Sequence, residues 1–473
     1  MLYSLRFKTK NLMTVRIPFI TLCILCAISI NSFAQDTLSI DFNTFLNKAL
    51  NNSGQIDYEW QNVNLAENRV EQAKDQRILP SITFDSQHGL VPGVKSDRTD
   101  LQEDEYYLDP NLRNDWENWA IFTRFQVSAA QPVFTWGAIN KAVEAARLGV
   151  EAAEYSFDAQ RSGLELRLFD LYYSYILALE IERLLNEAQE TVDRIEGQLN
   201  DMRDDPDSNL DDSEVFKFEI FKSEFEIQKT EVFENMAFVR ETWNYILRND
   251  ENEIYEPEVQ FLDPIASNIE TREFYQNAAF GNRPELRALE IGKEATETYI
   301  SSMKKQQLPG LYLAGYINFA NTPNRPRQSN PFIQNTTNLF SGGFGLTIRQ
   351  NLNFFSMKTS LERSEIELNK VTYAKDAAQD GILLEVNNNY RTASLANIKV
   401  EQTDNALVTS KRWLRQEQLD YDFGMGDAKD LIDAMRKELE LKLQLKQRIF
   451  EYNSSLAKLN KSAGIPLTTL ITN

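Results

Sequence analysis

The sequence is poor in the residues that form covalent cross-links, metal sites and acid–base catalysts. Among its 473 residues are two cysteines, Cys23 and Cys26, and one histidine, His88. A hydrolase needs a nucleophile, a base and an orienting group in one pocket, and this set offers little material for them. We therefore expect no enzyme, no cofactor and no metal ion, and we assign no catalytic, cofactor-binding or metal-binding residue.

Glycine, proline and positive charge are also scarce. The 18 glycines and 14 prolines are about 4% and 3% of the chain, below the roughly 7% and 5% of average proteins. This favours long, uninterrupted helices over sandwiches of short strands. Lys and Arg number 50 against 70 Asp and Glu, which gives a net charge of −20. Because phosphate binding requires a basic surface, nucleic acid is excluded as a partner.

Long apolar runs are missing except near the N-terminus, where Ile17 to Ile30 is mostly apolar. Four basic residues precede this run, and Ser32-Phe33-Ala34 follows it like a cleavage site. We therefore predict a signal peptide over residues 1–34; a short anchor helix is the weaker alternative. No later run has the 18 or so apolar residues of a transmembrane helix. Both cysteines lie within the predicted signal peptide, so the exported chain would have none.

Two parts of the sequence resemble each other. Leu79 to Phe84 matches Leu308 to Leu313 at an offset of 229 residues, and Gln131 to Phe134 matches Gln350 to Asn353 at an offset of 219. A longer first loop accounts for the difference. We predict two structural repeats, over residues 35–265 and 266–473, after the signal peptide.

Heptad spacing predicts two very long coiled-coil helices, Trp136 to Asp204 and Phe355 to Tyr421. In the second, an apolar or small residue recurs every seven positions from Val386 to Tyr421. Each helix would be about 100 Å long, which is too long for a compact domain. Shorter helices are predicted around them, at Ser53–Ile78, Asp212–Arg248, Arg283–Gln307 and Asp427–Asn460.

Four segments instead alternate apolar and polar residues, as strands do: Ser81–Gly89, Trp119–Val133, and segments beginning at Leu311 and Phe340. Strands of about 9 to 11 residues are what a tilted transmembrane β-barrel uses. Four strands cannot close a barrel in lipid, where open edges are not tolerated, so several chains must share one barrel. Three copies would supply twelve strands. A small soluble sheet is the alternative.

The complete pattern resembles the TolC-like outer-membrane efflux protein family. Besides the doubled layout, the resemblance rests on Leu79-Pro80 and Leu308-Pro309, on Asn282 to Leu286, and on Tyr421 to Gly424 followed by Asp430 to Ala434. It implies a mostly α chain with a small β part, and a homotrimer in which a shared twelve-stranded barrel lies in the outer-membrane lipid of a Gram-negative cell. An α-helical coiled-coil barrel would continue it through the periplasm.

The resemblance also implies a narrow periplasmic entrance formed by Tyr421, Asp430 and Asp433. Asp430 and Asp433 are three residues apart and share a helix face, so three subunits would place six carboxylates around one opening. Such a ring attracts cations and resists anions. The alternative is that these are solvated acids at a helix start, stabilised by its dipole. Where TolC itself has an arginine shortly after the turn glycine, this chain has Gly426, which puts an ionic lock in doubt.

Two turns at the same end are candidate contacts for a periplasmic adaptor. One contains Asp205 and Pro206, and the other contains Phe423, Gly424 and Met425. A solvated acidic turn is the simpler interpretation of the first.

We expect the chain to be the exit duct of a tripartite system, passing small toxic molecules from a periplasmic adaptor and inner-membrane pump to the exterior. The duct of a type I protein secretion system is the alternative within the family. A structural periplasmic coiled coil is less favoured because it needs no alternating strands.

Overall fold

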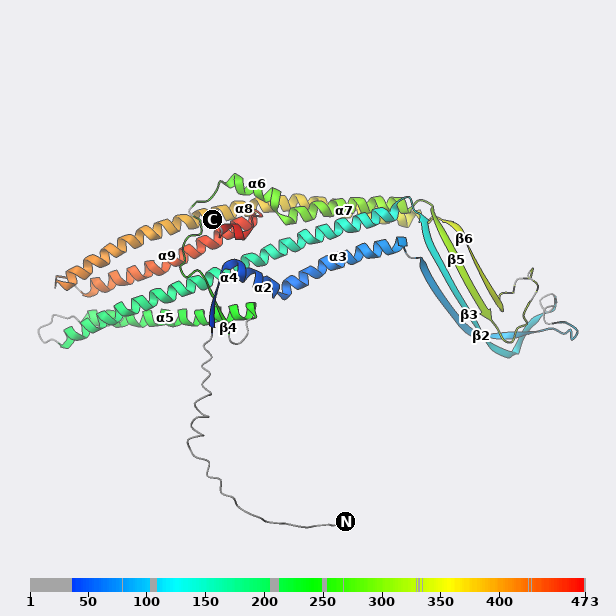
Figure 1. Cartoon of the computed structure of the whole chain (residues 1–473), viewed down its shortest axis with the longest axis horizontal. Helices are drawn as coiled ribbons and strands as arrows, with labels where there is room; N and C mark the ends of the chain where they lie inside the picture. The colour runs from blue at the N-terminus through cyan, green and yellow to red at the C-terminus, as the bar shows by residue number, and fades with distance from the viewer. Residues whose placement is uncertain are drawn as a thin grey trace, which may run out of the picture.

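A computed structural model provides the structure of the chain. It describes residues 36–78, 80–102, 109–204, 212–248, 253–266, 268–328, 330, 332–333, 335–423, 425–426 and 428–471. The molecule is elongated, with a four-stranded sheet at one end and the tips of two helical hairpins at the other (Figure 1).

The order helix, strand, strand, long helix, helix occurs twice. Its first copy consists of α3 (Gly54–Ile78), β2 (Ser81–Lys95), β3 (Arg113–Phe134), α4 (Ala138–Asp204) and α5 (Asp212–Leu247). The predicted bounds of the helices are correct to within about two residues. Those of the strands are not: β2 continues six residues beyond the predicted Gly89, and β3 begins six residues before the predicted Trp119.

The second copy consists of α7 (Pro284–Gln306), β5 (Gly310–Asn321), β6 (Leu339–Arg349), α8 (Phe354–Asp422) and α9 (Ala428–Ser462). The two long helices, α4 and α8, have 67 and 69 residues. No helix among the described residues has a stretch long and apolar enough to cross a bilayer.

Short elements surround the middle of the rod. The strands β1 (Asp36–Ile40) and β4 (Glu253–Pro257) pair in parallel, although they are far apart in the sequence. The helices α2 (Phe42–Asn51) and α6 (Arg272–Asn282) each begin at a capping side chain, and η2 (Leu467–Leu470) follows α9. The sequence pattern predicts none of these elements individually.

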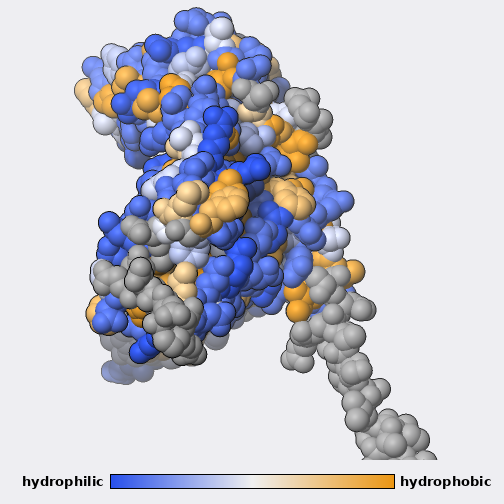
Figure 2. Space-filling view, turned by 90° about the vertical axis from the view of Figure 1, so that its left-hand side faces the viewer, coloured by the Kyte–Doolittle hydropathy of each residue, from blue (hydrophilic) through white to orange (hydrophobic). Residues whose placement is uncertain are grey.

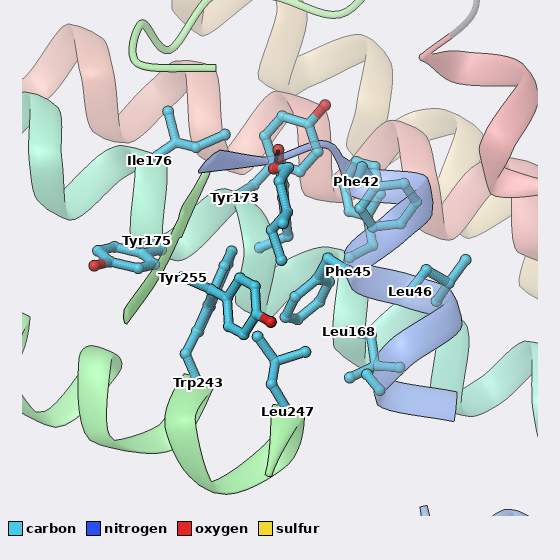
Figure 3. Packing of buried hydrophobic residues seen from close by; sticks show 14 of the residues in the cluster. Phe42, Phe45, Leu46, Leu168, Tyr173, Tyr175, Ile176, Trp243, Leu247 and Tyr255 are labelled. Atoms are coloured by element: carbon cyan, nitrogen blue, oxygen red, sulfur yellow. Dashed lines mark hydrogen bonds between the residues drawn. The ribbon is translucent and has the colours of Figure 1, made fainter. Parts of the chain in front are cut away.

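An aromatic core holds the middle of the rod together (Figure 3). Phe45 of α2 stacks on Trp243 of α5, with ring centroids 4.4 Å apart, and Tyr175 of α4 meets the same indole edge-on at 4.8 Å. All three side chains are fully buried. Aromatic residues bury about 150–250 Å² each and their pairs add about 0.5–1.5 kcal/mol, so this core fixes α2 and α5 on α4.

Nearer the tips, the predicted heptad positions form the contact between the two helical hairpins, which are α4 with α5 and α8 with α9. Leu185, Val192, Ile195 and Leu199 of α4 are buried in one cluster with residues of α5 and α9. In the second copy, Val386 and Ala393 of α8 are fully buried at the predicted spacing. The 3.5-residue periodicity of the sequence therefore predicts which residues pack between helices, as well as the helices themselves.

Candidate functional site

The first candidate region is the sheet, whose strand order is β2, β3, β5, β6, with every neighbouring pair antiparallel. The register aligns residues of one kind across all four strands. Phe84 pairs with Val127, Val127 with Ile317, and Leu313 with Leu346. Because paired residues point to the same side of a sheet, these side chains share one face.

We call this the apolar face of the sheet; its large members are Ile82, Phe84, Leu90, Trp119, Ile121, Phe125, Val127, Leu311, Leu313, Ile317, Phe319, Phe340, Phe344, Leu346 and Ile348. Phe344 is 89% exposed and Phe340 is 78% exposed. Monomeric soluble proteins rarely expose a continuous apolar surface of this kind. The face therefore requires an apolar environment outside the chain.

The opposite face is polar and built largely from small residues. Thr83 pairs with Ser128, Asp85 with Gln126, and Tyr312 with Thr347. This division into one apolar and one polar face is that of a barrel strand with lipid on one side and water on the other.

Both outer strands of the sheet, β2 and β6, have a neighbour on only one side within the described chain. An open edge offers unpaired N–H and C=O groups along its length. In lipid such groups must be paired, so the sheet is incomplete as a membrane structure until its edges meet other strands.

A group of three polar side chains, Ser86, His88 and Thr123, interrupts the apolar face, and sequence reasoning did not identify this group. His88 Nε2 lies 2.8 Å from Ser86 Oγ, and its Nδ1 lies 3.1 Å from Thr123 Oγ1. The imidazole also meets the ring of Phe125 edge-on at 5.6 Å. The three polar side chains satisfy one another, which lowers the cost of placing them on this face.

The second candidate region is the tip end, which Figure 2 views directly: the surface there is mostly hydrophilic with scattered apolar patches. Tyr421 lies in the last turn of α8 and packs against the apolar cluster between the hairpins. Its hydroxyl is 3.1 Å from Sδ of Met202 on α4. Tyr421 therefore connects the two hairpins.

Asp430 and Asp433 lie in the first two turns of α9, and both are exposed. Leu431 and Ile432, between them, are buried, so the helix presents its carboxylates on the side away from the hairpin contact. Neither carboxylate has an ion-pair partner among the residues described. The structure thus brings the two acids together on one face, but Tyr421 belongs to the contact between the hairpins.

Of the predicted adaptor contacts, Phe423 and Met425 are 72% and 76% exposed at the end of α8. Asp205, Pro206 and Gly424 lie outside the described residues. The N–H groups of Met425 and Gly426 both donate to the carbonyl of Asp420, at 2.8 and 2.9 Å.

Gly426 itself is packed against the end of α8. A Cβ at this position would lie 3.1 Å from the backbone of Asp420 and Tyr421. Gly426 therefore has a steric role in this turn.

A buried ion-pair network, which sequence reasoning also missed, lies at the middle of the rod. The side chain of Glu180 on α4 is 0% exposed. It pairs with Arg183 on the same helix and with Lys446 on α9, whose Nζ is 2.9 Å from Oε1. The same oxygen accepts the N–H of Leu262 at 2.9 Å, and Lys446 donates to the Leu262 carbonyl at 2.9 Å. The network joins α4, α9 and the segment after β4.

The motif from Asn282 to Leu286 has a structural role. Arg283 is buried and pairs with Glu285 and with Glu385 of α8, each at 3.0 Å. It also donates to the carbonyl of Ser462 at the end of α9, at 3.2 Å. Gly464, just after α9, has a φ of +67°. A Cβ added at this position would lie 2.8 Å from the carbonyl carbon of Asn282, so only glycine fits without rearrangement. The motif fastens α7 to α8 and α9.

Burial raises the pKa of two side chains on α4, Glu165 and Tyr173. Burial raises the pKa of Glu165, although the Arg161 guanidinium at 3.0 Å opposes the shift. Burial also raises the pKa of Tyr173 to about 12. Within the described residues, no group of three or more His, Cys, Asp or Glu side chains is placed to hold a metal ion.

The similarity of this chain to known proteins is one of structure and not of sequence. No protein-family model matches the chain, and no curated protein matches its sequence. Solved structures do match. A membrane protein from Pseudomonas aeruginosa has a TM-score of 0.69 at 14% identity, covering 92% of this chain and 95% of its own. The outer membrane protein VceC from Vibrio cholerae has a TM-score of 0.66 at 15% identity, covering 90% and 96%.

The CmeC outer membrane channel of Campylobacter jejuni is similar in the same way, with a TM-score of 0.67 at 14% identity over 90% of this chain and 86% of its own. At such identities the match concerns the fold. This mostly helical chain with its small four-stranded sheet has the fold of the TolC-like outer-membrane channels.

Proposed function

We propose that the protein is the outer-membrane exit duct of an efflux system and conducts small molecules rather than catalysing a reaction. The observation that carries this proposal is the sheet: an uncovered apolar face, a polar opposite face and two open edges, at the end of a helical rod. The fold shared with outer-membrane channels supports it.

Three copies of the chain form the duct. With four strands each, three copies supply twelve, which is within the range of membrane barrels, whereas one copy is below the smallest barrel of about eight. The edge of β6 in one subunit then pairs with that of β2 in the next, and the apolar face meets lipid. The predicted signal peptide directs export across the inner membrane, and the chain then inserts into the outer membrane from the periplasm.

The helical part of the chain also exposes apolar side chains that a single chain leaves uncovered. Apolar side chains that remain exposed run along α5: Phe216, Ile220, Ile227, Phe238 and Tyr245. Another set runs along α8: Ile366, Tyr373, Leu384, Leu395 and Ile398. Their spacing keeps each set on one side of its helix. In a trimer these stripes pack against adjacent subunits and close a helical tube through the periplasm.

The tip end is the entrance. Asp430 and Asp433 from three subunits surround the opening and favour cations, while Tyr421 holds the hairpins together behind them. The exposed Phe423 and Met425 contact a periplasmic adaptor, which links the duct to an inner-membrane pump, as would Asp205, Pro206 and Gly424.

Two experiments test the proposal, one on the purified protein and one in cells. The purified chain should need detergent for extraction, have the mass of three subunits and conduct ions in planar bilayers; a monomer that is soluble without detergent would refute the duct. Deletion of the gene should raise sensitivity to small toxic compounds. Loss of secreted proteins without any change in drug sensitivity would replace efflux by the type I secretion alternative.

A further inference from the structure

A cavity of about 370 Å³ lies between the two helical hairpins, above the tips. Residues of α4, α5, α8 and α9 line it, so both hairpins contribute walls. It is distinct from the tip turns and from the exposed faces of Asp430 and Asp433. Its volume is within the roughly 300–1,000 Å³ of small-molecule sites.

The floor of the cavity is apolar. Ile195, Phe221, Met435 and Leu439 line it, and all four belong to the buried cluster that joins the hairpins. Leu414 of α8 adds to this surface. An apolar body of limited size is therefore the part of a ligand that the cavity accommodates best.

The rim of the cavity carries a net positive charge, whereas the net charge of the whole chain is negative. Four basic residues line the cavity, namely Arg194, Lys411, Arg415 and Lys442, against the two acids Glu187 and Glu438.

Lys442 pairs with Glu438 at 2.8 Å, and Glu187 lies 3.9 Å from Arg183. Arg194, Lys411 and Arg415 have no ion-pair partner in the described part of the chain. In a protein with a net charge of −20, three unpaired cations around an apolar cavity are a local exception.

We propose that this cavity binds an amphipathic organic anion: a compact apolar body carrying one carboxylate, sulfate or sulfonate group. The body lies on the floor formed by Ile195, Met435 and Leu439, and the anionic group is bound by Arg415 and Lys411 of α8 and Arg194 of α4. Guanidinium and ammonium groups form strong charge-assisted hydrogen bonds with such groups. This goes beyond the proposed duct, because the site lies in a single chain and binding to it requires no transport.

Occupancy has a mechanical consequence. A ligand that contacts both hairpins binds best at the hairpin separation seen here, and it therefore stabilises that separation relative to a wider one. The site is thus placed to influence how far the tips open.

The test uses the full chain in lipid nanodiscs with a photoreactive probe, a benzoic acid carrying a trifluoromethyl diazirine on its ring, whose aryl group is a compact apolar body. After illumination, labelled peptides are identified by mass spectrometry. We expect saturable labelling of peptides containing residues 184–195, 411–419 and 431–442. The double variant Lys411→Glu with Arg415→Glu should weaken the apparent affinity at least about tenfold, since it replaces two charge-assisted contacts by like-charge repulsion.

Three controls make the result decisive. Lys399→Glu with Arg412→Glu makes the same charge change on α8 outside the cavity and should leave labelling unchanged. Ala188→Phe fills the cavity without altering its charge and should abolish labelling. The probe with an alcohol in place of the carboxylate should label weakly. Equal labelling by the alcohol, equal labelling in both charge variants, or labelling confined to the sheet would overturn the proposal, and none of these results would bear on the duct itself.

Discussion

The phenol of Tyr421 and the thioether of Met202 meet at the tip end of the molecule, with 3.1 Å between the oxygen and the sulfur, although 219 residues separate them. The same offset relates Gln131 to Gln350 in the sequence repeat. The two residues therefore occupy equivalent positions in the two copies, and the hairpins touch each other through matching points near their ends.

This contact predicts that joining the two positions prevents the tips from separating. In the variant Met202→Cys with Tyr421→Cys, a short bis-maleimide should cross-link the hairpins within one chain, because the two native cysteines, Cys23 and Cys26, lie in the predicted signal peptide. We expect loss of transport in cells after cross-linking, with trimer assembly retained. Each single-cysteine variant is the control. Full transport after complete cross-linking would show that the tips do not need to part.

The acidic face of α9 predicts ion selectivity. Replacing both carboxylates, as Asp430→Asn with Asp433→Asn, should lower the cation-to-anion permeability ratio severalfold, since a ring of negative charge favours cations at a narrow opening. Reversal potentials in planar bilayers under a salt gradient measure this ratio. Glu401→Gln with Asp404→Asn removes two exposed charges from α8 away from the tip. An equal change in that variant would argue against a ring at the entrance.

The two faces of the sheet predict opposite tolerance to charge. Phe344→Arg places a charge on the apolar face and should destabilise the protein in a bilayer by about 2–4 kcal/mol. Thr347→Arg places the same side chain on the polar face of the same strand and should cost much less. Urea-dependent folding into lipid vesicles measures both. Equal costs would mean that the apolar face does not contact lipid.

The sequence predicts the long helices well because their stability depends on a repeated local pattern. Val386 and Ala393, seven residues apart, are both fully buried as the heptads require. The strands are predicted less well at their outer ends. After Gly89 the apolar residues Leu90 and Val91 are adjacent instead of alternating with polar ones, so the strand pattern is lost six residues before β2 ends at Lys95.

Contacts between distant residues account for what the sequence does not predict. The parallel pairing of Asp36 with Glu253 depends on where the aromatic core places both strands. Similarly, nothing in the local sequence distinguishes Glu180 from the many solvated acids of α4. Its burial depends on Lys446, 266 residues away. The carboxylate pair of Asp430 and Asp433 was predictable because helix spacing alone puts both on one face.

The buried network predicts a large stability effect at the middle of the rod. Lys446→Met leaves the fully buried Glu180 without its partner on α9 and should reduce the free energy of unfolding by about 3–5 kcal/mol. Lys437→Met removes a solvent-exposed pair with Glu440 on the same helix, and should cost at most about 1 kcal/mol. Adding Glu180→Gln to Lys446→Met should recover part of the loss in urea unfolding. No recovery would mean that the lysine acts through packing alone.

The pKa of Glu165 predicts how stability changes with pH. Because burial raises this pKa in the folded chain, the folded state binds a proton more readily than the unfolded state as the pH falls from 7 towards the acidic range. The contribution of Glu165 to stability is therefore greatest in acid and is lost as the pH rises through the raised pKa. Glu165→Gln cannot titrate, so the stability of the wild type relative to this variant should increase on acidification. Urea unfolding of both proteins between pH 7.5 and 4.5, followed by circular dichroism, measures the difference; a constant difference would exclude a raised pKa at this position.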